Sequence, residues 1–284
     1  MERSVFFDLA CENGRGDGEE GKESQIWRSP RGSFVLRKGE NTTHGNYAVF
    51  FTEPLWQLND DCFFELLEGI SGELSMLLSR ARSPKNSTLL IAGLGNAAMT
   101  ADALGAEVVG RVTVTRKLYE ANSSVRIAAV ATGVLGTTGI ETYEHLRALC
   151  EVIRPFAVIA VDALSAKTRE RLGATVQIST GGISPGAGVG NSQKRLSENT
   201  LGIPVITLGV PTVIHSSAIV REAFETIGVE HWESAKNFLA EDGGLFVMPK
   251  ESDLLLRSAS LLLSSAIDRA CRTLAEFSHI SGAD

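Results

Sequence analysis

Two aspartates lie beside glycine-rich or apolar segments of this sequence that could deliver them to one site. Asp102 lies within residues 93–105, Gly-Leu-Gly-Asn-Ala-Ala-Met-Thr-Ala-Asp-Ala-Leu-Gly, and Asp162 directly follows Val-Ile-Ala-Val at 158–161. Apolar runs of this kind are typical of buried parallel strands, and the loops at the carboxyl ends of such strands form the ligand crevice of an open α/β sheet. Paired carboxylates can divide acid and base roles between them, or bind a metal ion together. The sequence therefore predicts an enzyme, with hydrolysis as the first chemistry to consider.

Each aspartate also has a purely structural interpretation. Asp102 is predicted in the first turn of a helix, where the helix dipole stabilises a carboxylate. Asp162 could cap the amino end of a following helix. Its position at the end of a buried run nevertheless favours delivery of the side chain to the mouth of a crevice.

Further polar groups are predicted at the same edge of the sheet. Residues 133–139, Gly-Val-Leu-Gly-Thr-Thr-Gly, form a second flexible loop, and Glu141 follows it either as a helix cap or as a site residue. Backbone amides and side-chain donors in such loops can stabilise an oxyanion. The predicted substrate-binding or oxyanion-stabilising residues are Asn96, Gly136, Thr137, Thr138 and Glu141.

Three other chemistries receive little support from the motifs present. Residues 93–98 match the dinucleotide-binding pattern G-x-G-x-x-A, but Val-Ala-Thr at 130–132 stands where the confirming acid is expected. Ser184 could be a nucleophile, yet neither His145 nor His215 lies in a recognisable partner motif, and G-x-S-x-G is absent. H-E-x-x-H is absent too, so a metal site of two Asp and one His has no support from spacing. We expect no cofactor and no resident metal ion.

The composition is typical of a globular protein with one large core. The chain has 284 residues, of which 43% are hydrophobic and 21% charged. The net charge of −7 argues against nucleic-acid binding, which depends on Lys and Arg. Four scattered cysteines form neither a disulfide framework nor a zinc signature, which indicates reduced thiols. No secretory signal is evident, and Arg257 interrupts the apolar stretch at 254–263, so we expect a cytoplasmic protein without a membrane partner.

Hydrophobic periodicity predicts alternating strands and helices after a polar start. Residues 1–32 are predicted to be a mobile N-terminal arm or propeptide, and residues 33–284 a single α/β domain. Repeated βα units predict a mostly parallel sheet flanked by helices on both faces. Strands are predicted at 33–36, 47–52, 88–92, 125–130, 156–161, 175–178 and 204–208, and helices at 59–80, 100–117, 139–153, after 214 and at 261–267.

A series of glycine-rich and apolar motifs follows in a fixed order along the chain. The motifs occupy residues 93–105, 133–142, 161–164, 182–191, 201–205 and 209–213, with weaker support at 45–52 and 248–250. Together they resemble the germination protease family of endospore-forming bacteria. Several ordered motifs are far more specific than any single glycine loop.

The resemblance implies an endopeptidase, made as a zymogen, that degrades small acid-soluble spore proteins when a spore germinates. It implies a fold similar to that of hydrogenase maturation proteases, an α/β three-layer sandwich with the site at the sheet edge. The two essential aspartates of the family would fall on Asp102 and Asp162. Asp8, Leu9 and Ala10 resemble the processing segment of the family, which implies self-cleavage beside them. A homotetramer in the spore core, formed in the forespore, is also implied.

The chain departs from the family pattern at a few positions. It is shorter than the resemblance leads one to expect. Thr180 and Gly181 stand where an acid or amide followed by Thr is expected, Ala187 replaces Ser, and His215 replaces Asp. These departures bear on substrate fit and leave the proposed pair unchanged.

The predicted mechanism is hydrolysis without a covalent intermediate. One ionised carboxylate activates water, and the other, kept protonated by burial and by its neighbour's charge, donates a proton to the carbonyl or the leaving amine. The sequence leaves open which aspartate plays which role. A metal-assisted peptidase of the hydrogenase maturation type and a non-catalytic relative that binds spore proteins remain alternatives.

Overall fold

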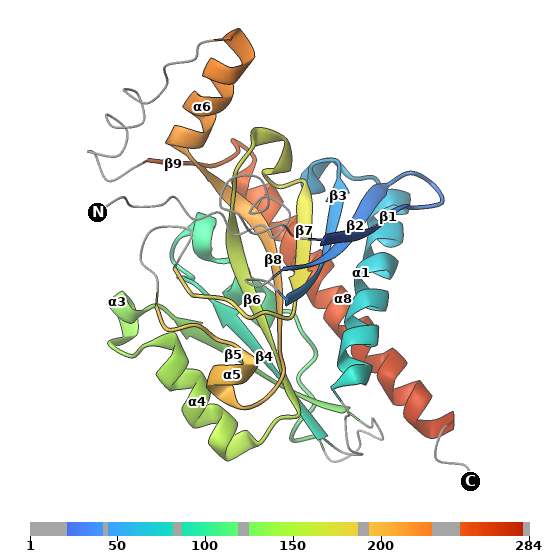
Figure 1. The fold of residues 1–284 in the computed structure, drawn as a ribbon. Coiled ribbons are helices and arrows are strands. Elements are labelled where there is room, and N and C mark those ends of the chain that lie inside the picture. The colour runs from blue at the N-terminus through green and yellow to red at the C-terminus, as the bar shows by residue number, and fades with distance from the viewer. Residues whose placement is uncertain are drawn as a thin grey trace.

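The computed structural model describes residues 22–41, 45–81, 87–118, 125–186, 193–228 and 245–280. Within these ranges the chain forms a nine-stranded mixed sheet with helices packed against it (Figure 1). None of the helices described there has both the length and the apolar character that a bilayer span requires.

Nine strands and seven helices have the following bounds. The strands are β1 Lys22–Arg28, β2 Phe34–Asn41, β3 Gly45–Thr52, β4 Ser87–Leu94, β5 Val125–Gly133, β6 Ala157–Ala166, β7 Thr175–Ser179, β8 Val205–His215 and β9 Phe246–Val247. The α-helices described are α1 Asp60–Arg80, α2 Leu104–Val109, α3 Leu135–Thr138, α4 Thr142–Ile153, α5 Glu198–Leu201, α6 Ser216–Ile227 and α8 Ser252–Ile280. Three 3₁₀ turns join them: η1 Leu55–Gln57, η2 Thr100–Asp102 and η3 Arg169–Arg171.

The sheet is mixed, and the prediction of a mostly parallel sheet is wrong. The strand order is β1-β2-β3-β7-β8-β6-β4-β5, with β9 paired to β8. Only the pairs β8–β6, β6–β4 and β4–β5 are parallel. The other described pairs, from β1 to β8 through β7 and between β8 and β9, are antiparallel.

Short connections explain the antiparallel half. A parallel neighbour needs a crossover of about a dozen residues or more, whereas a tight turn can only return the chain antiparallel. β1 and β2 are joined by a turn at 29–33 in which Gly32 has a φ of 77°. Likewise, only residues 42–44 separate the end of β2 from the start of β3. The apolar pattern predicted strands at 33–36, 47–52 and 175–178 but carried no information on their direction.

One face of the sheet is covered by α1 and α8, which lie side by side (Figure 1). Alternate side chains of the strands, such as Phe50, Ile91 and Ile159, are fully buried against this helical layer. α1 begins as predicted, because Asn59 Oδ1 accepts a hydrogen bond from the Cys62 amide at 2.9 Å. The predicted buried helix near the C-terminus is confirmed within α8, where Ile267 is fully buried.

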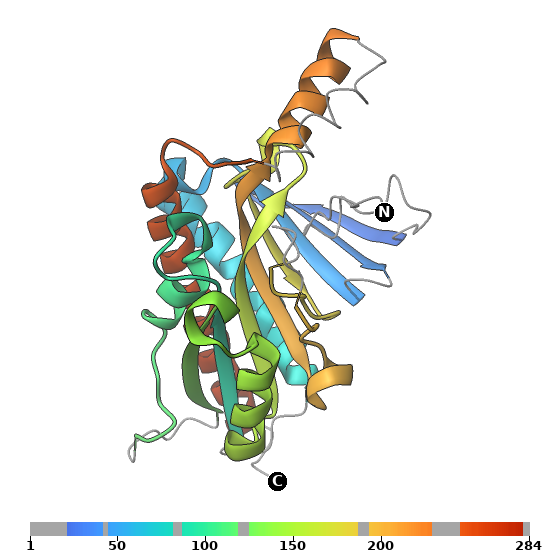
Figure 2. The same cartoon turned by 90° about the vertical axis from the view of Figure 1, so that its left-hand side faces the viewer.

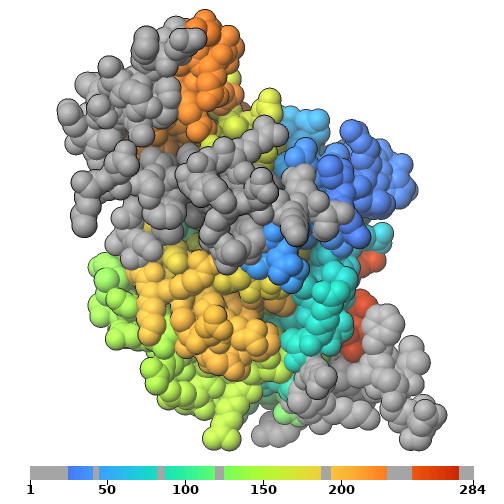
Figure 3. All heavy atoms as spheres, in the orientation of Figure 1, coloured from blue at the N-terminus to red at the C-terminus, as the bar shows by residue number. Residues whose placement is uncertain are grey.

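The opposite face is covered by α4 along the parallel half. Leu146 of α4 packs with Leu90 of β4 and with Val158 and Ala160 of β6. The segment that leads into α5 lies beside α4 on the surface (Figure 3). Lys194 of that segment lies 3.7 Å from the ring centroid of Tyr143. Helices therefore pack on both faces of the parallel strands.

Several predicted elements differ from the structure at their boundaries, three of them as follows. β1 lies within the segment predicted to be an arm, and residues 1–21 lie outside the described ranges. The predicted helix at 100–117 is a 3₁₀ turn, η2, followed by the short helix α2. The predicted helix at 139–153 begins at Thr142, because Gly139 ends α3 with a φ of 70°.

Candidate active site

Asp162 lies inside β6 rather than at its end. It pairs with Gly209 of β8, and the pairing of the two strands continues to Ala166. The predicted strand end at this residue is therefore wrong, because the long strand β8 keeps pairing beyond it. Asp162 is 8% exposed, and its Oδ1 accepts a hydrogen bond from the Ala163 amide at 2.9 Å.

The side chain of Asp162 belongs to the face opposite α1 and α8. Successive side chains of a strand alternate between faces, and both Val161 and Ala163 pack into the core on the α8 side. Polar side chains of the next strands share the face of Asp162: Gln177 of β7 pairs with Gly209, and the hydroxyls of Ser179 and Thr207 lie 2.6 Å apart. Asp162 therefore lies at the margin of a polar strip on this face.

Asp102 lies just beyond the carboxyl end of β4, within η2. Its Oδ2 accepts a hydrogen bond from the Asn96 amide at 2.7 Å. Gly95 has a φ of 94°, and a Cβ atom there would lie 2.1 Å from the Asp102 carbonyl oxygen. The chain must therefore have glycine at position 95 for the loop to fold back over the aspartate. Asn96 itself uses its Oδ1 to accept from the Ala98 amide at 3.0 Å.

Close backbone packing brings the Asp102 loop to the strand that carries Asp162. A Cβ atom on Gly105 would lie 2.3 Å from Leu94 N and 2.6 Å from Val161 O. A Cβ atom on Gly93 would lie 2.1 Å from the Gly105 carbonyl oxygen. The glycines of this motif thus allow α2 to pack against the end of β4 and against β6 at Val161. Asp102 therefore lies just beyond the carboxyl end of β4, and Asp162 directly follows Val161, the last residue of β6 that pairs with β4.

The two carboxyl groups are partly or fully removed from water. Burial raises the pKa of Asp102 above its usual value, and the hydrogen bond from the Asn96 amide only partly offsets this effect. Asp102 Oδ2 and Asp162 Oδ1 each accept a hydrogen bond from a backbone amide, so these contacts are the same for the two acids and do not distinguish an acid from a base.

Thr212 is a contact residue that sequence reasoning missed. Its Oγ1 donates a hydrogen bond of 2.6 Å to the carbonyl oxygen of Ala101, the residue before Asp102. Thr212 follows Pro211 in β8 and is 4% exposed. A proline inside a strand pattern signals a bulge or an edge, and that signal could have directed attention to Thr212.

The second predicted loop follows β5, the neighbour of β4 in the sheet. Gly136, Thr137 and Thr138 lie in the exposed helix α3, and both threonine hydroxyls donate to the Val134 carbonyl oxygen. Glu141 is the N-cap residue of α4, and its amide donates to Glu144 Oε2 at 3.3 Å. The structure thus places these residues beyond the end of β5, with the two hydroxyls engaged in their own turn.

The third glycine-rich loop follows β7. Thr180 Oγ1 accepts from the Asn46 amide at 3.1 Å, and Arg195 donates to the carbonyl oxygen of Gly181 at 2.8 Å. Ser184 lies in the same loop. Thr180 and Gly181 thus have structural contacts with β3 and with the segment before α5.

His215 ends β8 and caps α6. Its Nδ1 accepts a hydrogen bond from the Ser217 amide at 3.1 Å, and burial lowers its pKa. Its ring meets that of Phe246 edge to face at 5.1 Å. Figure 2 shows α6 projecting from this end of β8, away from the sheet. Ala187 and the predicted processing residues Asp8, Leu9 and Ala10 lie outside the described residues.

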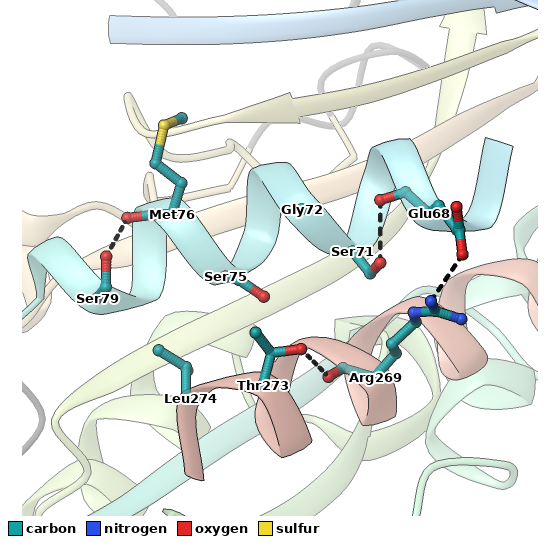
Figure 4. Close-up of a pocket in the computed structure, with 9 residues that line it drawn as sticks. All are labelled: Glu68, Ser71, Gly72, Ser75, Met76, Ser79, Arg269, Thr273 and Leu274. Carbon is teal, nitrogen blue, oxygen red and sulfur yellow. Dashed lines mark hydrogen bonds and ion pairs between the residues drawn. The ribbon is translucent and has the colours of Figure 1, made fainter. Parts of the chain in front are cut away.

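Among the described residues, neither a metal site nor the hollow between α1 and α8 offers a second candidate active site. Within the described ranges, no three His, Cys, Asp or Glu side chains gather as a metal ion would require. A hollow of about 690 Å³ lies between α1 and α8 (Figure 4). Its Ser71, Ser79 and Thr273 hydroxyls donate to carbonyl oxygens of their own helices, and Arg269 pairs with Glu68 at 2.7 Å. These polar groups are therefore occupied, and none belongs to the loops that hold the two acids.

Comparison with known proteins identifies one consistent group of relatives. The family model described as germination protease matches residues 35–238. The germination protease of Clostridium acetobutylicum is 34% identical over 270 residues, which cover 84% of this chain and 81% of that protein. The germination protease of Clostridium perfringens is 38% identical over 236 residues, covering 71% of this chain and 73% of the relative. That of Clostridium tetani is 34% identical over 273 residues, covering 86% and 84%.

Proposed function

Because the chain belongs to the germination protease family, which indicates a peptidase role in germination, we propose that it is an endopeptidase that begins the degradation of small acid-soluble spore proteins. The observation that supports the proposal is that Asp102 follows the carboxyl end of β4, while Asp162 follows Val161, the last residue of the neighbouring parallel strand β6 that pairs with β4. Loops at such strand ends are where α/β proteins hold their ligands.

The proposed reaction is water attack on a peptide bond, assisted by two carboxyl groups. Asp162 in its ionised form takes a proton from water, and the oxygen of that water attacks the carbonyl carbon. Asp102, whose pKa is raised by burial, donates its proton to the carbonyl oxygen, which gives a tetrahedral gem-diol. Asp162 then passes the proton that it took from water to the leaving nitrogen, while a hydroxyl of the gem-diol returns its proton to Asp102. The peptide C–N bond breaks, and a carboxylic acid and an amine leave.

Stabilisation of the developing oxyanion is assigned to donors near Asp102. The side-chain amide of Asn96 and the loop around Gly136, Thr137 and Thr138 lie beyond the ends of β4 and β5. Donors that are fixed before the reaction lower the barrier without a reorganisation cost. Glu141 is proposed as a substrate contact at the start of α4.

Maturation, assembly and location complete the proposal. Residues 1–32 are proposed to include a propeptide, removed by self-cleavage near Asp8, Leu9 and Ala10. The active form is proposed to be a homotetramer in the spore core, without membrane or direct nucleic-acid partners. N-terminal sequencing of activated protein tests the cleavage, and a chain that still begins at Met1 or Glu2 contradicts it.

The test uses the full chain, a purified small acid-soluble spore protein and mass spectrometry of the products. Wild type is compared with Asp102→Asn and Asp162→Asn, with Asp61→Asn as the matched control because its carboxylate is exposed and pairs with Arg31 at the surface. We expect discrete fragments from wild type and the control, and a loss of at least about a thousandfold in each active-site variant. Circular dichroism checks that every variant is folded.

Chelator separates the proposed mechanism from its alternatives. Cleavage that survives chelator in wild type, and is lost in both active-site variants, supports the carboxylate pair. Cleavage that chelator abolishes and one added metal restores reassigns the aspartates as metal ligands. Binding of the spore protein without any product identifies a non-catalytic relative, and turnover retained by either Asn variant overturns the pair.

A further inference from the structure

One strand, β8, contacts the backbone around both proposed catalytic residues. Gly209 of β8 pairs with Asp162 of β6, and a Cβ atom on Gly209 would lie 2.7 Å from the Asp162 carbonyl oxygen. Three residues later, Thr212 bonds to the turn that holds Asp102. The same short stretch of chain therefore lies against both aspartates.

A register shift between β6 and β8 falls at Thr212. Leu164 pairs with Pro211, whereas the next residue, Ser165, pairs with Val213, so Thr212 has no partner on β6. This is the geometry of a β-bulge, which leaves one residue unpaired. The Thr212 hydroxyl reaches η2, where it bonds to the Ala101 carbonyl oxygen.

The contact fixes the peptide group from which Asp102 projects. Thr212 Oγ1 donates to the Ala101 carbonyl oxygen at 2.6 Å, and the Asp102 amide donates to the Met99 carbonyl oxygen at 2.8 Å. That carbonyl and that amide belong to one planar peptide unit, so both ends of the plane are held. The starting direction of the Asp102 side chain is therefore set from β8.

We infer that Thr212 is a positioning residue, whose hydroxyl holds Asp102 in place relative to Asp162 through the bulge of β8. The substrate does not need to touch it. A hydroxyl that is 4% exposed and bonded to a backbone carbonyl orients its partner without taking part in proton transfer. Since this role rests on the proposed function of the Asp pair, its test includes a measurement that needs no catalysis.

The variants separate the hydroxyl from the shape of the side chain. Thr212→Val removes the hydroxyl and keeps the branched shape, which a strand accommodates well. Thr212→Ser keeps the hydroxyl and removes one methyl group. Thr52→Val is the matched control, because Thr52 Oγ1 also donates to a backbone carbonyl, that of Ser33 at 3.0 Å, on a strand that holds neither acid.

The kinetic readout is the division between kcat and KM for cleavage of a spore protein by the full chain. We expect Thr212→Val to lower kcat about tenfold with KM nearly unchanged, the size expected from one well-placed hydrogen bond. Thr212→Ser should restore most of kcat, and Thr52→Val should match wild type. Equal kcat values in Thr212→Val and Thr52→Val overturn the inference.

The second readout is the titration of Asp102 by carbon-detected NMR, with the signal assigned by its loss in Asp102→Asn. Burial raises the pKa of this carboxyl group. Release of the turn in Thr212→Val should admit water and move the titration to lower pH, while Thr52→Val leaves it in place. No movement in Thr212→Val overturns the inference even if no cleavage is ever detected. If both Asp→Asn variants retain activity, the proposed function fails, whatever the titration shows.

Discussion

The two halves of the sheet are built differently and serve different purposes. β8, β6, β4 and β5 run parallel, and the carboxyl ends of β4 and β6 lie close to the loop and strand that hold the two acids. β1, β2, β3 and β7 run antiparallel and bury Phe34 and Phe50 against α1. Parallel strands gather their loops at one edge, whereas an antiparallel meander alternates them between both edges. The comparison teaches that the proposed chemistry belongs to the parallel half, whereas both halves contribute to the buried core.

The largest effect is expected from a substitution that disrupts backbone packing in the parallel half. Gly105→Ala would place a Cβ atom within 2.6 Å of three backbone atoms of Leu94 and Val161. We expect a loss of about 4 kcal/mol or more in the free energy of unfolding, together with loss of cleavage, because backbone cannot move aside as a side chain can. Urea unfolding and a cleavage assay measure both. The control Gly72→Ala meets open space on α1 and should be slightly stabilising, and equal behaviour of the two variants contradicts the packing argument.

Phe50→Ala addresses the antiparallel half. Phe50 is fully buried, with its ring 5.2 Å from that of Phe34, so its loss should cost about 3–5 kcal/mol in the free energy of unfolding. Cleavage per folded molecule should stay near the wild-type value, because β3 carries none of the proposed site. The measurement is chemical denaturation combined with activity corrected for the folded fraction. A selective loss of kcat in folded protein would contradict the division of roles.

A smaller loss of stability is expected from breaking ion pairs, and it should differ between a partly buried pair and an exposed one. Lys38 of β2 pairs with Glu73 of α1, and their side chains are 27% and 14% exposed. Glu73→Gln should cost about 1 kcal/mol, because Lys38 keeps a partly buried charge. Glu151→Gln, which breaks the exposed pair with Arg147 on α4, should cost less than about 0.5 kcal/mol. Denaturation midpoints compare the two, and a larger cost for Glu151→Gln would reverse the ranking.

The smallest expected effect concerns the dependence of stability on pH. The pKa of Asp102 is raised by burial, so the folded state binds its proton more tightly than the unfolded state does. Folding stability contributed by this group is present below the unfolded pKa and is lost as pH rises through the folded pKa. Asp102→Asn should therefore be more stable than wild type at neutral pH, with the difference vanishing in acid. Thermal melts between acid and neutral pH measure this, and a difference that grows toward acid contradicts it.

The sequence predicted which helices and strands form better than how the strands pair in the sheet. The apolar runs identified strands β3 to β8 because buried strands need continuous hydrophobic side chains, and the helix predicted at 59–80 matches α1, which Asn59 caps. Strand direction depends on which distant segments pair, and β7 pairs with β3 through contacts such as Ser179 with Tyr47. The local periodicity of hydrophobic residues does not predict which distant strands pair.

The candidate site was predicted in part for the same physical reason. Asp102 and Asp162 stood out because each follows an apolar run, and in the structure Asp102 follows the end of β4 while Asp162 lies inside β6, one residue after its pairing with β4 ends. Gly93 and Gly95 match a dinucleotide-binding pattern in the sequence, whereas in the structure they allow close packing against the backbone of Gly105 and Asp102. Thr212 could not be identified as a contact, because its role depends on a one-residue shift between β6 and β8.

The place of β7 between β3 and β8 has a consequence for the order of events on the ribosome. The Asn46 amide bonds to Thr180 Oγ1, 134 residues further along the chain, so β1, β2 and β3 cannot join the sheet until β7 has been synthesised. The contacts of Asp162 with Gly209, and of the Asp102 turn with Thr212, likewise cannot form until β8 has been synthesised. A nascent chain that ends before β8 therefore cannot assemble the candidate site. The proposed peptidase stays inactive during the period when most of its own backbone is still unfolded and exposed to cleavage.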